Sequence, residues 1–374
     1  MNYDLTPEQN ILKESAHKLL GKECPSEYVR EMAEDEKGYT EGLWKKMAEL
    51  GWMSLLIPEA YEGSGFNFMD LSVVLFEMGY YCLPGPFFST VVQSGLTILE
   101  AGSDAQKKAL LPEIADGKQK LSLAWLEKEG IYTPSGIKLI AELEEDNYVL
   151  SGTKLFVLDA HVADTIICVA RTDKAEEGIS FFLVDANTKG LKVDLLDTMS
   201  GDKQCRVVFD NVSVPKDNLL GDLNKGWDAL EKVLLMAAVA KSAEMSGGGE
   251  KVMDLVFPYA KGRKQFGRPI GAFQAIQHHC ANMLTYGDTI KFLVYNAAWK
   301  ITEGLPYAMD AAICKAWVSD SARSLVALGH QIVGGVGFME EYDLQLYFKR
   351  AKTAGQMFGS ADYHRELVAR EMGL

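Results

Sequence analysis

The run from Tyr259 to His278 contains the side chains best suited to hold a charged ligand. It reads YAKGRKQFGRPIGAFQAIQH. A helix is expected to end near Arg263, and the Phe-Gly and Arg-Pro-Ile steps turn the chain into a new helix. The guanidinium of Arg263, the amide of Gln265 and free backbone N–H groups then gather near one point, an arrangement that suits a pyrophosphate. The residues alone leave open a second interpretation, a capped turn between two helices with Arg263 in a salt bridge.

Three regions with different residue patterns must position these side chains. Residues 1 to about 118 show helical spacing, and Thr6-Pro7 resembles a helix start with Thr6 as the N-cap. Residues 119–222 alternate short β-branched and aromatic runs with turn residues, which predicts a small antiparallel sheet or barrel. Residues 223–374 return to a helical period with a wide apolar face, as in a helix bundle. The four strand runs lie at 147–150, 165–170, 179–184 and 206–209.

Three consecutive glycines, Gly247 to Gly249, lie inside the third region. No strand precedes them and no lysine follows in P-loop register. We therefore interpret them as a close contact between helices rather than a phosphate loop.

Composition narrows the class of protein. The chain has 374 residues and a net charge of −14, which disfavours nucleic acid or an anionic membrane as the main partner. No apolar stretch approaches the length of a membrane-spanning helix, and the first residues lack the pattern of a secretory signal, so we expect a cytoplasmic protein without membrane insertion. The six cysteines are scattered and form no CxxC pair. They predict buried free thiols and no metal site.

The run 259–278 resembles a hallmark of the acyl-CoA dehydrogenase family. A second segment, HQIVGGVGF from His330 to Phe338, resembles the family's Gln-x-x-Gly-Gly-x-Gly-Phe motif, and weaker matches follow in order along the whole chain. The resemblance implies an α+β fold of an N-terminal helical domain (1–118), a middle β-domain (119–222) and a C-terminal four-helix bundle (223–374). It also implies FAD, an acyl-CoA substrate oxidised to its trans-2-enoyl-CoA, a tetramer, and an electron-transfer flavoprotein as partner.

The same resemblance implies which residues hold the cofactor. Gln331, Gly334 and Gly335 let the backbone approach the FAD pyrophosphate of a neighbouring subunit. Two hydroxyl contacts that the family makes to the isoalloxazine are replaced by Leu126 and Leu158. The other expected cofactor residues are Arg263, Gln265, Phe266, Gln274, Phe156 (which keeps a stacking surface) and Ser360.

The base that removes the α-proton is missing from both of its usual positions. The reaction needs a partly desolvated carboxylate beside Cα. In the family's commonest pattern that glutamate falls at Phe358, and in a second pattern it falls at or near Ala238. Neither side chain accepts a proton, so the catalytic residue stays unknown.

We therefore hypothesise that the chain is the base-lacking subunit of a heterotetramer whose related chain supplies the glutamate. One alternative is a self-sufficient homotetramer that uses Glu127, Asp159 or Asp362 as its base. Others are a reductase or oxidase variant of the same fold, and a catalytically silent structural or CoA-thioester-binding subunit. His278-His279 predicts no metal site, and His364 is expected on a solvated helix face.

Overall fold

The computed structural model describes residues 4–175 and 177–374, so the first three residues of the segment interpreted for a secretory signal lie outside it. The chain divides into two compact units, each described by itself. A helical unit contains Met1–Glu31, Asn67–Leu83 and Leu235–Leu374, and a sheet unit contains Met32–Phe66 and Pro84–Leu234.

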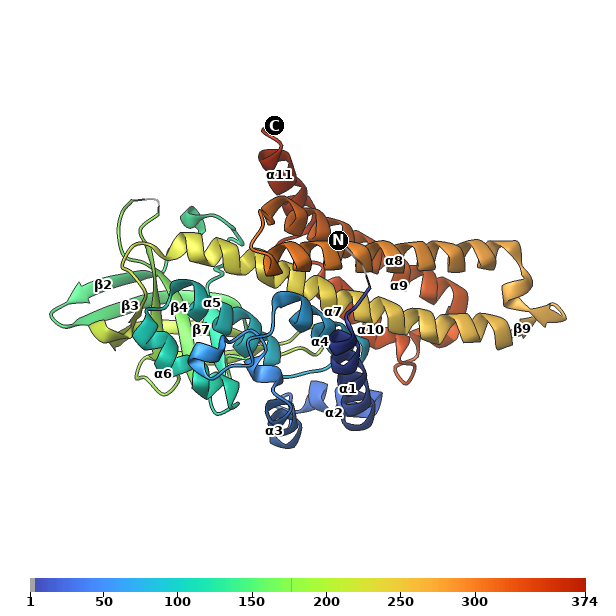
Figure 1. Cartoon of the computed structure of the whole chain (residues 1–374), viewed down its shortest axis with the longest axis horizontal. Coiled ribbons are helices and arrows are strands. Elements are labelled where there is room, and N and C mark those ends of the chain that lie inside the picture. The colour runs from blue at the N-terminus through green and yellow to red at the C-terminus, as the bar shows by residue number, and fades with distance from the viewer. Residues whose placement is uncertain (1–3, 176) are drawn as a thin grey trace. The chain divides into compact units, whose positions relative to one another are not determined.

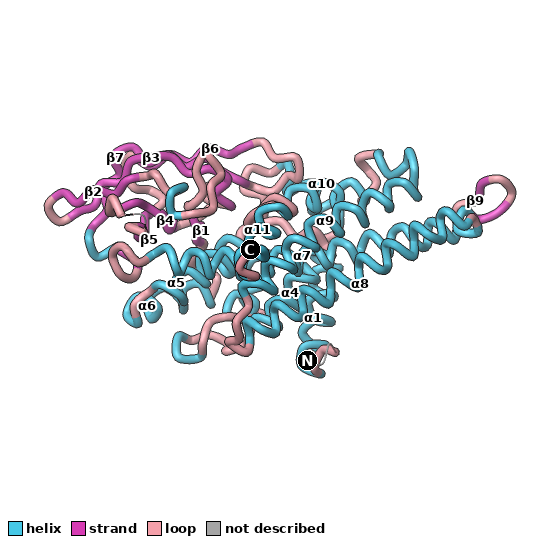
Figure 2. The backbone as a smooth tube through the Cα atoms, turned by 90° about the horizontal axis from the view of Figure 1, so that it is seen from above, coloured by secondary structure: helices cyan, strands magenta, loops and turns pink. Residues whose placement is uncertain are grey.

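Long helices form the helical unit. Figures 1 and 2 show α7 and α8 running alongside each other and joined by the β9–β10 hairpin, and α9 packs against α8, α10 and α11. Thr6 is the predicted N-cap, because its side chain accepts a hydrogen bond from the Gln9 N–H. The elements are α1 (Pro7–Glu23), α2 (Ser26–Glu34, which continues into the other unit), α4 (Phe68–Tyr80), α7 (Gly226–Gly262, which begins in the other unit), β9 (Lys264–Gln265), β10 (Arg268–Pro269), η6 (Ile270–Ala272), α8 (Gln274–Thr302), α9 (Ala308–Val333), η7 (Gly334–Phe338), α10 (Leu344–Ala354) and α11 (Ala361–Glu371).

Glycines allow α4 and α7 to touch backbone to backbone. A Cβ atom added at Gly247 would lie 1.8 Å from the Phe76 carbonyl oxygen, and one added at Gly79 would lie 1.8 Å from the Glu244 carbonyl oxygen. Either added atom would force the helices apart. The interpretation of Gly247–Gly249 as a packing contact is therefore confirmed for Gly247.

The sheet unit is built on an eight-stranded sheet in the order β6-β7-β3-β2-β4-β5-β8, with β1 paired to β4. All four predicted strand runs lie inside strands. The expectation of a purely antiparallel sheet is wrong, because β1 and β2 both pair with β4 in parallel. The strands are β1 (Leu121–Ala124), β2 (Ile140–Glu144), β3 (Asn147–Leu158), β4 (Thr165–Arg171), β5 (Ile179–Asp185), β6 (Leu191–Leu196), β7 (Gln204–Pro215) and β8 (Leu219–Leu220).

Short helices complete this unit. They precede or connect the strands, and the segment η3 has the wider π-helical hydrogen bonding. They are α3 (Glu41–Glu49), η1 (Trp52–Ser54), η2 (Glu59–Tyr61), η3 (Phe88–Ser94), α5 (Gly95–Ala101), α6 (Asp104–Ala115), η4 (Pro134–Gly136) and η5 (Lys216–Asn218).

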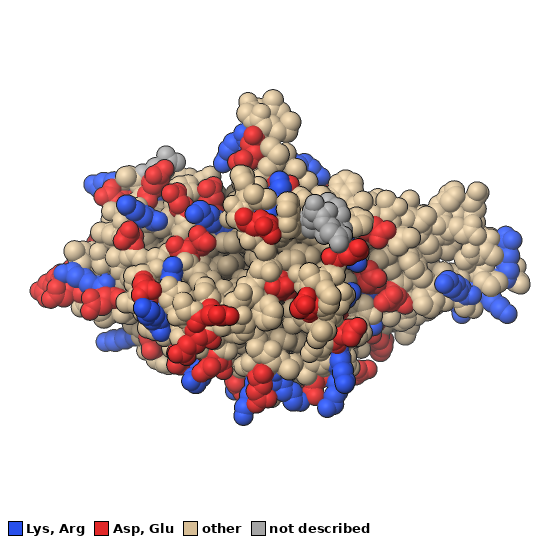
Figure 3. Space-filling model, viewed as in Figure 1, with Lys and Arg blue, Asp and Glu red and all other residues tan. Residues whose placement is uncertain are grey.

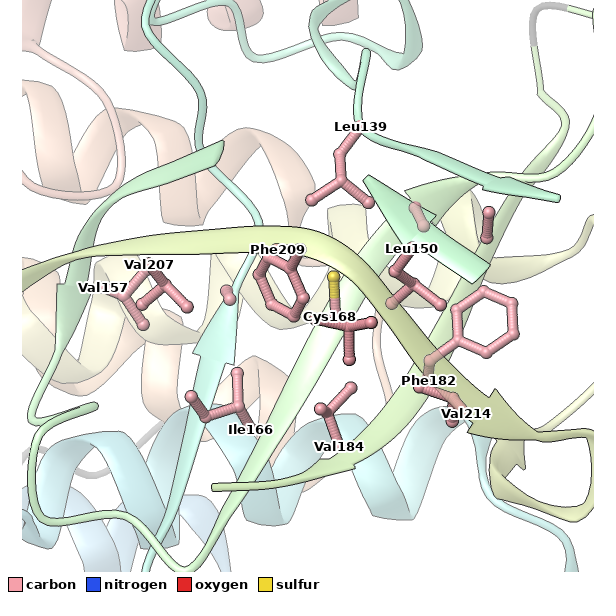
Figure 4. Close-up of a cluster of buried hydrophobic side chains, with 14 of the residues drawn as sticks. Leu139, Leu150, Val157, Ile166, Cys168, Phe182, Val184, Val207, Phe209 and Val214 are labelled. Carbon is pink, nitrogen blue, oxygen red and sulfur yellow. The ribbon is translucent and has the colours of Figure 1, made fainter. Parts of the chain in front are cut away.

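One face of the sheet forms an apolar core, shown in Figure 4. Ile166 and Cys168 of β4 point toward Phe182 of β5 and Phe209 of β7. These side chains alternate along their strands, as the two-residue period of a strand requires. The remaining face of β4 is also buried, since Ile167 is fully enclosed. This double burial explains why the strand is apolar from Ile166 to Ala170.

The cysteines are free, as expected, and five of the six are buried while Cys280 is partly exposed. Burial raises the pKa of the Cys168 thiol to about 12, which makes it unreactive near neutral pH. Among the described residues, none of the helices combines the length and apolar character needed to cross a bilayer.

Candidate functional site

The predicted pyrophosphate motif forms an exposed hairpin between α7 and α8. The hairpin closes by a two-residue turn, because Gln265 pairs with Arg268 and the residues between them, Phe266 and Gly267, have φ of 52° and 79°. Two consecutive positive φ values are those of a type I′ turn, which explains the glycine. Phe266 is 91% exposed. The turn thus presents its side chains and backbone to the outside.

Basic side chains gather at this hairpin, as Figure 3 shows for the end of the helical unit where α7 and α8 meet. The Arg268 guanidinium carbon lies 4.1 Å from the centre of the Phe273 ring and is held there by cation–π attraction. Arg263, Gln265 and Gln274 are all exposed. Within the described residues, none of the ion pairs engages Arg263. The alternative interpretation, a salt bridge at Arg263, therefore finds no support.

The second motif begins where α9 ends. Gly334 has φ of 71° and ψ of −145°, a combination open only to glycine. A Cβ at Gly334 or at Gly335 would meet nothing within 4 Å, so their backbone is accessible. The Tyr259 hydroxyl donates to the Val333 carbonyl at 3.3 Å, which ties this segment to the last turns of α7. The structure thus brings the Gln331–Gly335 segment near the helix end that precedes Arg263.

A histidine that sequence reasoning left unassigned supports this second motif from within. His330 is 6% exposed, and its ring lies 4.9 Å from that of Phe338 and 5.0 Å from that of Phe348. Burial lowers its pKa, so the ring is neutral near pH 7. It acts as an aromatic packing residue beneath the glycine-rich turn.

The first base position, Phe358, lies between α10 and α11 and contains no proton acceptor. Phe358 is 6% exposed and has φ of 58°, which costs a non-glycine residue about 1–2 kcal/mol. His364 Nε2 lies 2.8 Å from the Phe358 carbonyl oxygen. Ser360 is the N-cap of α11, because its hydroxyl accepts from the Tyr363 N–H at 3.3 Å. The placement of His364 on a solvated face is wrong, since only 1% of it is exposed.

The second base position, Ala238, is equally inert. Ala238 is fully buried in α7, and its carbonyl accepts from the Ser242 hydroxyl at 2.8 Å. The next carboxylate along the helix is Glu244, two turns further on and ion-paired with Lys241. Lys241 follows Ala238 by one turn, so the charge on that helix face is a cation.

In the sheet unit, the three predicted flavin-edge residues lie around a bulge. The pairing of β3 with β7 shifts register between Lys154 and Val157, and Phe156 inside the bulge has φ of 56°. Its side chain is 55% exposed, whereas Leu158 is 8% exposed. The Leu155 N–H donates to the Leu126 carbonyl at 2.9 Å, which joins Leu126 to the bulge. A bulge can re-aim a side chain, and here it presents an aromatic face.

The three alternative bases are all engaged by other groups. Glu127 Oε1 accepts from Lys154 Nζ at 2.7 Å and from the N–H groups of Lys138 and Leu139 at 2.9 Å each. Asp159 Oδ2 accepts from the Ser89 hydroxyl at 2.8 Å. Asp362 is paired with Arg365 on the surface. Each carboxylate would have to leave these partners to reach a substrate, so the contacts weigh against all three.

Comparison with known families covers almost the whole chain. Models of the acyl-CoA dehydrogenase N-terminal, middle and C-terminal domains match residues 6–118, 122–212 and 224–373. The probable acyl-CoA dehydrogenase YngJ of Bacillus subtilis is 31% identical over 382 residues, with both chains covered completely. Acryloyl-CoA reductase (NADH) of Anaerotignum propionicum is 30% identical over 380 residues, covering all of this chain and 96% of the relative.

Solved structures agree with these matches. Butyryl-CoA dehydrogenase from Megasphaera elsdenii superposes with a TM-score of 0.92 at 28% identity, and both chains are fully covered. A chain of the ChsE4–ChsE5 complex from Mycobacterium tuberculosis superposes with a TM-score of 0.91 at 24% identity, covering all of this chain and 99% of that one. The predicted three-domain fold class is confirmed, whereas the boundaries near 118 and 222 remain predictions.

Proposed function

The chain belongs to the acyl-CoA dehydrogenase family of FAD-dependent oxidoreductases, and from this membership we propose that it is a base-lacking subunit of a two-chain acyl-CoA dehydrogenase. The reaction removes a proton from Cα and a hydride from Cβ of a CoA thioester. The observation that carries the proposal is the buried Phe358 at the first base position, with Ala238 at the second. The proton must then be taken by a residue of another chain.

The residues present fit FAD on the pyrophosphate side. Arg263 and Gln265 are exposed donors on the hairpin. Gly334 and Gly335 leave open space where a Cβ would stand, although the Gly334 N–H already donates to the His330 carbonyl. A diphosphate suits this set, since arginine forks and free N–H groups are its usual ligands. FAD, when bound, accepts the hydride. In this proposal Gln274 and Ser360 add polar contacts to the cofactor.

The residues expected beside the isoalloxazine ring offer fewer polar groups. Phe156 offers an exposed ring for stacking, and Leu126 and Leu158 replace the two hydroxyls of the family pattern. In this proposal the chain contributes more to holding the pyrophosphate than to tuning the ring. The fold neighbour ChsE4–ChsE5 is itself a complex of two differently named chains, which is the arrangement proposed here. Electrons would leave through an electron-transfer flavoprotein, and the assembly would be the family's tetramer.

A second candidate, reduction of an enoyl-CoA, is favoured by the 30% identity to acryloyl-CoA reductase. Reduction delivers a proton to Cα and therefore needs an acid where oxidation needs a base. Phe358 can act as neither acid nor base, so in both directions a partner chain would have to supply the group that transfers the proton. Comparing reduction of acryloyl-CoA by NADH with bleaching of the flavin by butyryl-CoA separates the two.

The test is to purify the chain alone and co-expressed with a related acyl-CoA dehydrogenase chain of the same source. We expect a yellow heterotetramer by native mass spectrometry and absorbance, and bleaching by an acyl-CoA only in that complex. Full activity of the single chain would support the self-sufficient homotetramer instead. A colourless complex would support a silent structural or CoA-thioester-binding subunit.

A further inference from the structure

Two buried polar side chains converge on the segment Gly355–Ser360, which we call the base segment because it carries Phe358. One comes from α9 and the other from α11. Nothing in the sequence pointed to Lys315, and a solvated face was expected for His364, but both lie within the helical unit.

The first is Lys315, which is completely buried. Its Nζ donates to the carbonyl oxygens of Ala354 at 3.0 Å and Gly355 at 3.2 Å, and to the Ser319 hydroxyl at 3.0 Å. That hydroxyl donates its own hydrogen to the Lys315 carbonyl, so it can only accept from Nζ. Three acceptors use all three hydrogens of an ammonium group. Lys315 thus caps the C-terminus of α10, where carbonyls lack helical partners and carry partial negative charge, and all three donors are present while the amine is protonated.

The second is His364, one turn into α11. A carbonyl only accepts, so the contact of 2.8 Å with the Phe358 oxygen assigns the hydrogen to Nε2. Nδ1 is buried and has no partner among the described residues. The ring is therefore a neutral donor with one fixed tautomer.

Together these contacts hold the backbone on both sides of residue 358. Phe358 has φ of 58° and Gly359 has φ of 99°. A Cβ at Gly359 would lie 2.9 Å from His364 Nε2 and 2.4 Å from the Tyr363 ring, so the imidazole packs directly on this turn. Gly359 adopts a positive φ readily, whereas Phe358 at a positive φ is strained and persists where its surroundings hold it.

We propose that Lys315 and His364 are positioning residues that set the direction of the side chain at position 358. The link to catalysis rests on the proposed function, because only there is position 358 the place of the base. The clamp itself, meaning Lys315 and His364 with the carbonyls they bind, is a property of the fold.

Hydrogen–deuterium exchange of the full-length chain tests the clamp without any activity. The variants are His364→Leu, which cannot donate, and His364→Gln, whose amide can. We expect amides 356–360 to exchange at least about 10-fold faster in His364→Leu than in the wild type, and to stay within about 3-fold in His364→Gln. Lys315→Met should accelerate amides 355–358 in the same way. Strand β4 in the sheet unit is the control and should not change.

Equal exchange in the leucine and glutamine variants would overturn the proposal, as would acceleration spread equally over α8, α9 and α11. If His364→Leu does not fold, the pair Lys315→Met and Lys315→Arg decides by the same criterion, because arginine keeps donors.

A kinetic readout in the Phe358→Glu background tests the positioning role. With butyryl-CoA as probe, His364→Leu should lower kcat of Phe358→Glu about 10-fold with little change in KM, and His364→Gln should restore it. Equal kcat values in both variants would contradict positioning. If Phe358→Glu itself has no activity, the proposed function fails, while the exchange experiment still judges the clamp.

Discussion

The hairpin Arg263–Gly267 and the base segment Gly355–Ser360 differ in what they offer a ligand. The hairpin is exposed, with no ion pair at the Arg263 side chain among the described residues and open space where a Cβ would stand at Gly267. The base segment is held from within by buried donors, and its central side chain is a hydrocarbon. Under the proposed function, the hairpin keeps the family's cofactor-holding residues while the base segment lacks a proton acceptor. The comparison teaches that an exposed motif and a buried segment of one chain can be under different demands.

The largest expected effect comes from restoring the base. General base catalysis contributes about 10²–10⁴-fold, so Phe358→Glu should raise the rate of flavin bleaching by butyryl-CoA at least about 100-fold in the single chain. Phe358→Gln is the matched control, because it is similar in size and cannot take the proton. Equal rates in the two variants would show that position 358 does not face the substrate.

Breaking the Glu127–Lys154 pair tests the alternative base in the sheet unit. Lys154 is fully buried, so Glu127→Gln leaves an uncompensated charge and should lower the free energy of unfolding by about 3 kcal/mol. Denaturant unfolding measures this loss. A variant of unchanged stability that has lost turnover would instead identify Glu127 as the base.

The cofactor role proposed for the exposed hairpin is tested by removing the guanidinium group of Arg263. Arg263→Ala should weaken FAD binding about 10- to 150-fold, because a hydrogen bond to a charged group contributes about 1.5–3 kcal/mol. Fluorescence titration of the apoprotein with FAD measures the Kd. Arg323→Ala removes a surface arginine paired with Asp320 and serves as control. A similar loss in both variants would mean that only net charge matters.

The smallest expected effect, taken per pH unit, is the pH dependence that Lys315 gives to the free energy of unfolding. Burial lowers the pKa of Lys315 from 10.5 to about 7, with Cys314 and Lys241 as the nearby titrating groups. Between pH 7 and 10.5 the unfolded chain therefore keeps a proton that the folded chain has released. The free energy of unfolding of the wild type should rise relative to Lys315→Met by about 1 kcal/mol for each pH unit in this window. Thermal unfolding at several pH values measures it, and a constant difference would mean that folding does not lower the pKa of Lys315.

Local signals in the sequence were enough to predict the turn of the hairpin. Phe266-Gly267 between two polar residues predicts a turn after a helix, and the structure has that turn. The strands β3, β4, β5 and β7 were likewise visible as apolar runs, because their composition is local, whereas β1, β2, β6 and β8 were not predicted. Their parallel pairing to β4 was not, since pairing depends on contacts far apart in the chain.

The clamp could not be found in the same way. Lys315 binds carbonyls 39 and 40 residues further on, and an isolated lysine in a helix gives no sign of burial. His364 lies beside Asp362 and Arg365, both exposed, so its helix face was interpreted as solvated. Only the packing of α11 on α9 places it inside.

The central claim is that this chain holds the cofactor but supplies no base. Exchange of the α-protons of butyryl-CoA in D₂O, followed by NMR, measures a base directly and needs no electron acceptor. We predict exchange at the buffer rate for the chain alone, and rapid exchange for Phe358→Glu and for the co-expressed two-chain complex. Rapid exchange by the wild-type chain alone would contradict the account.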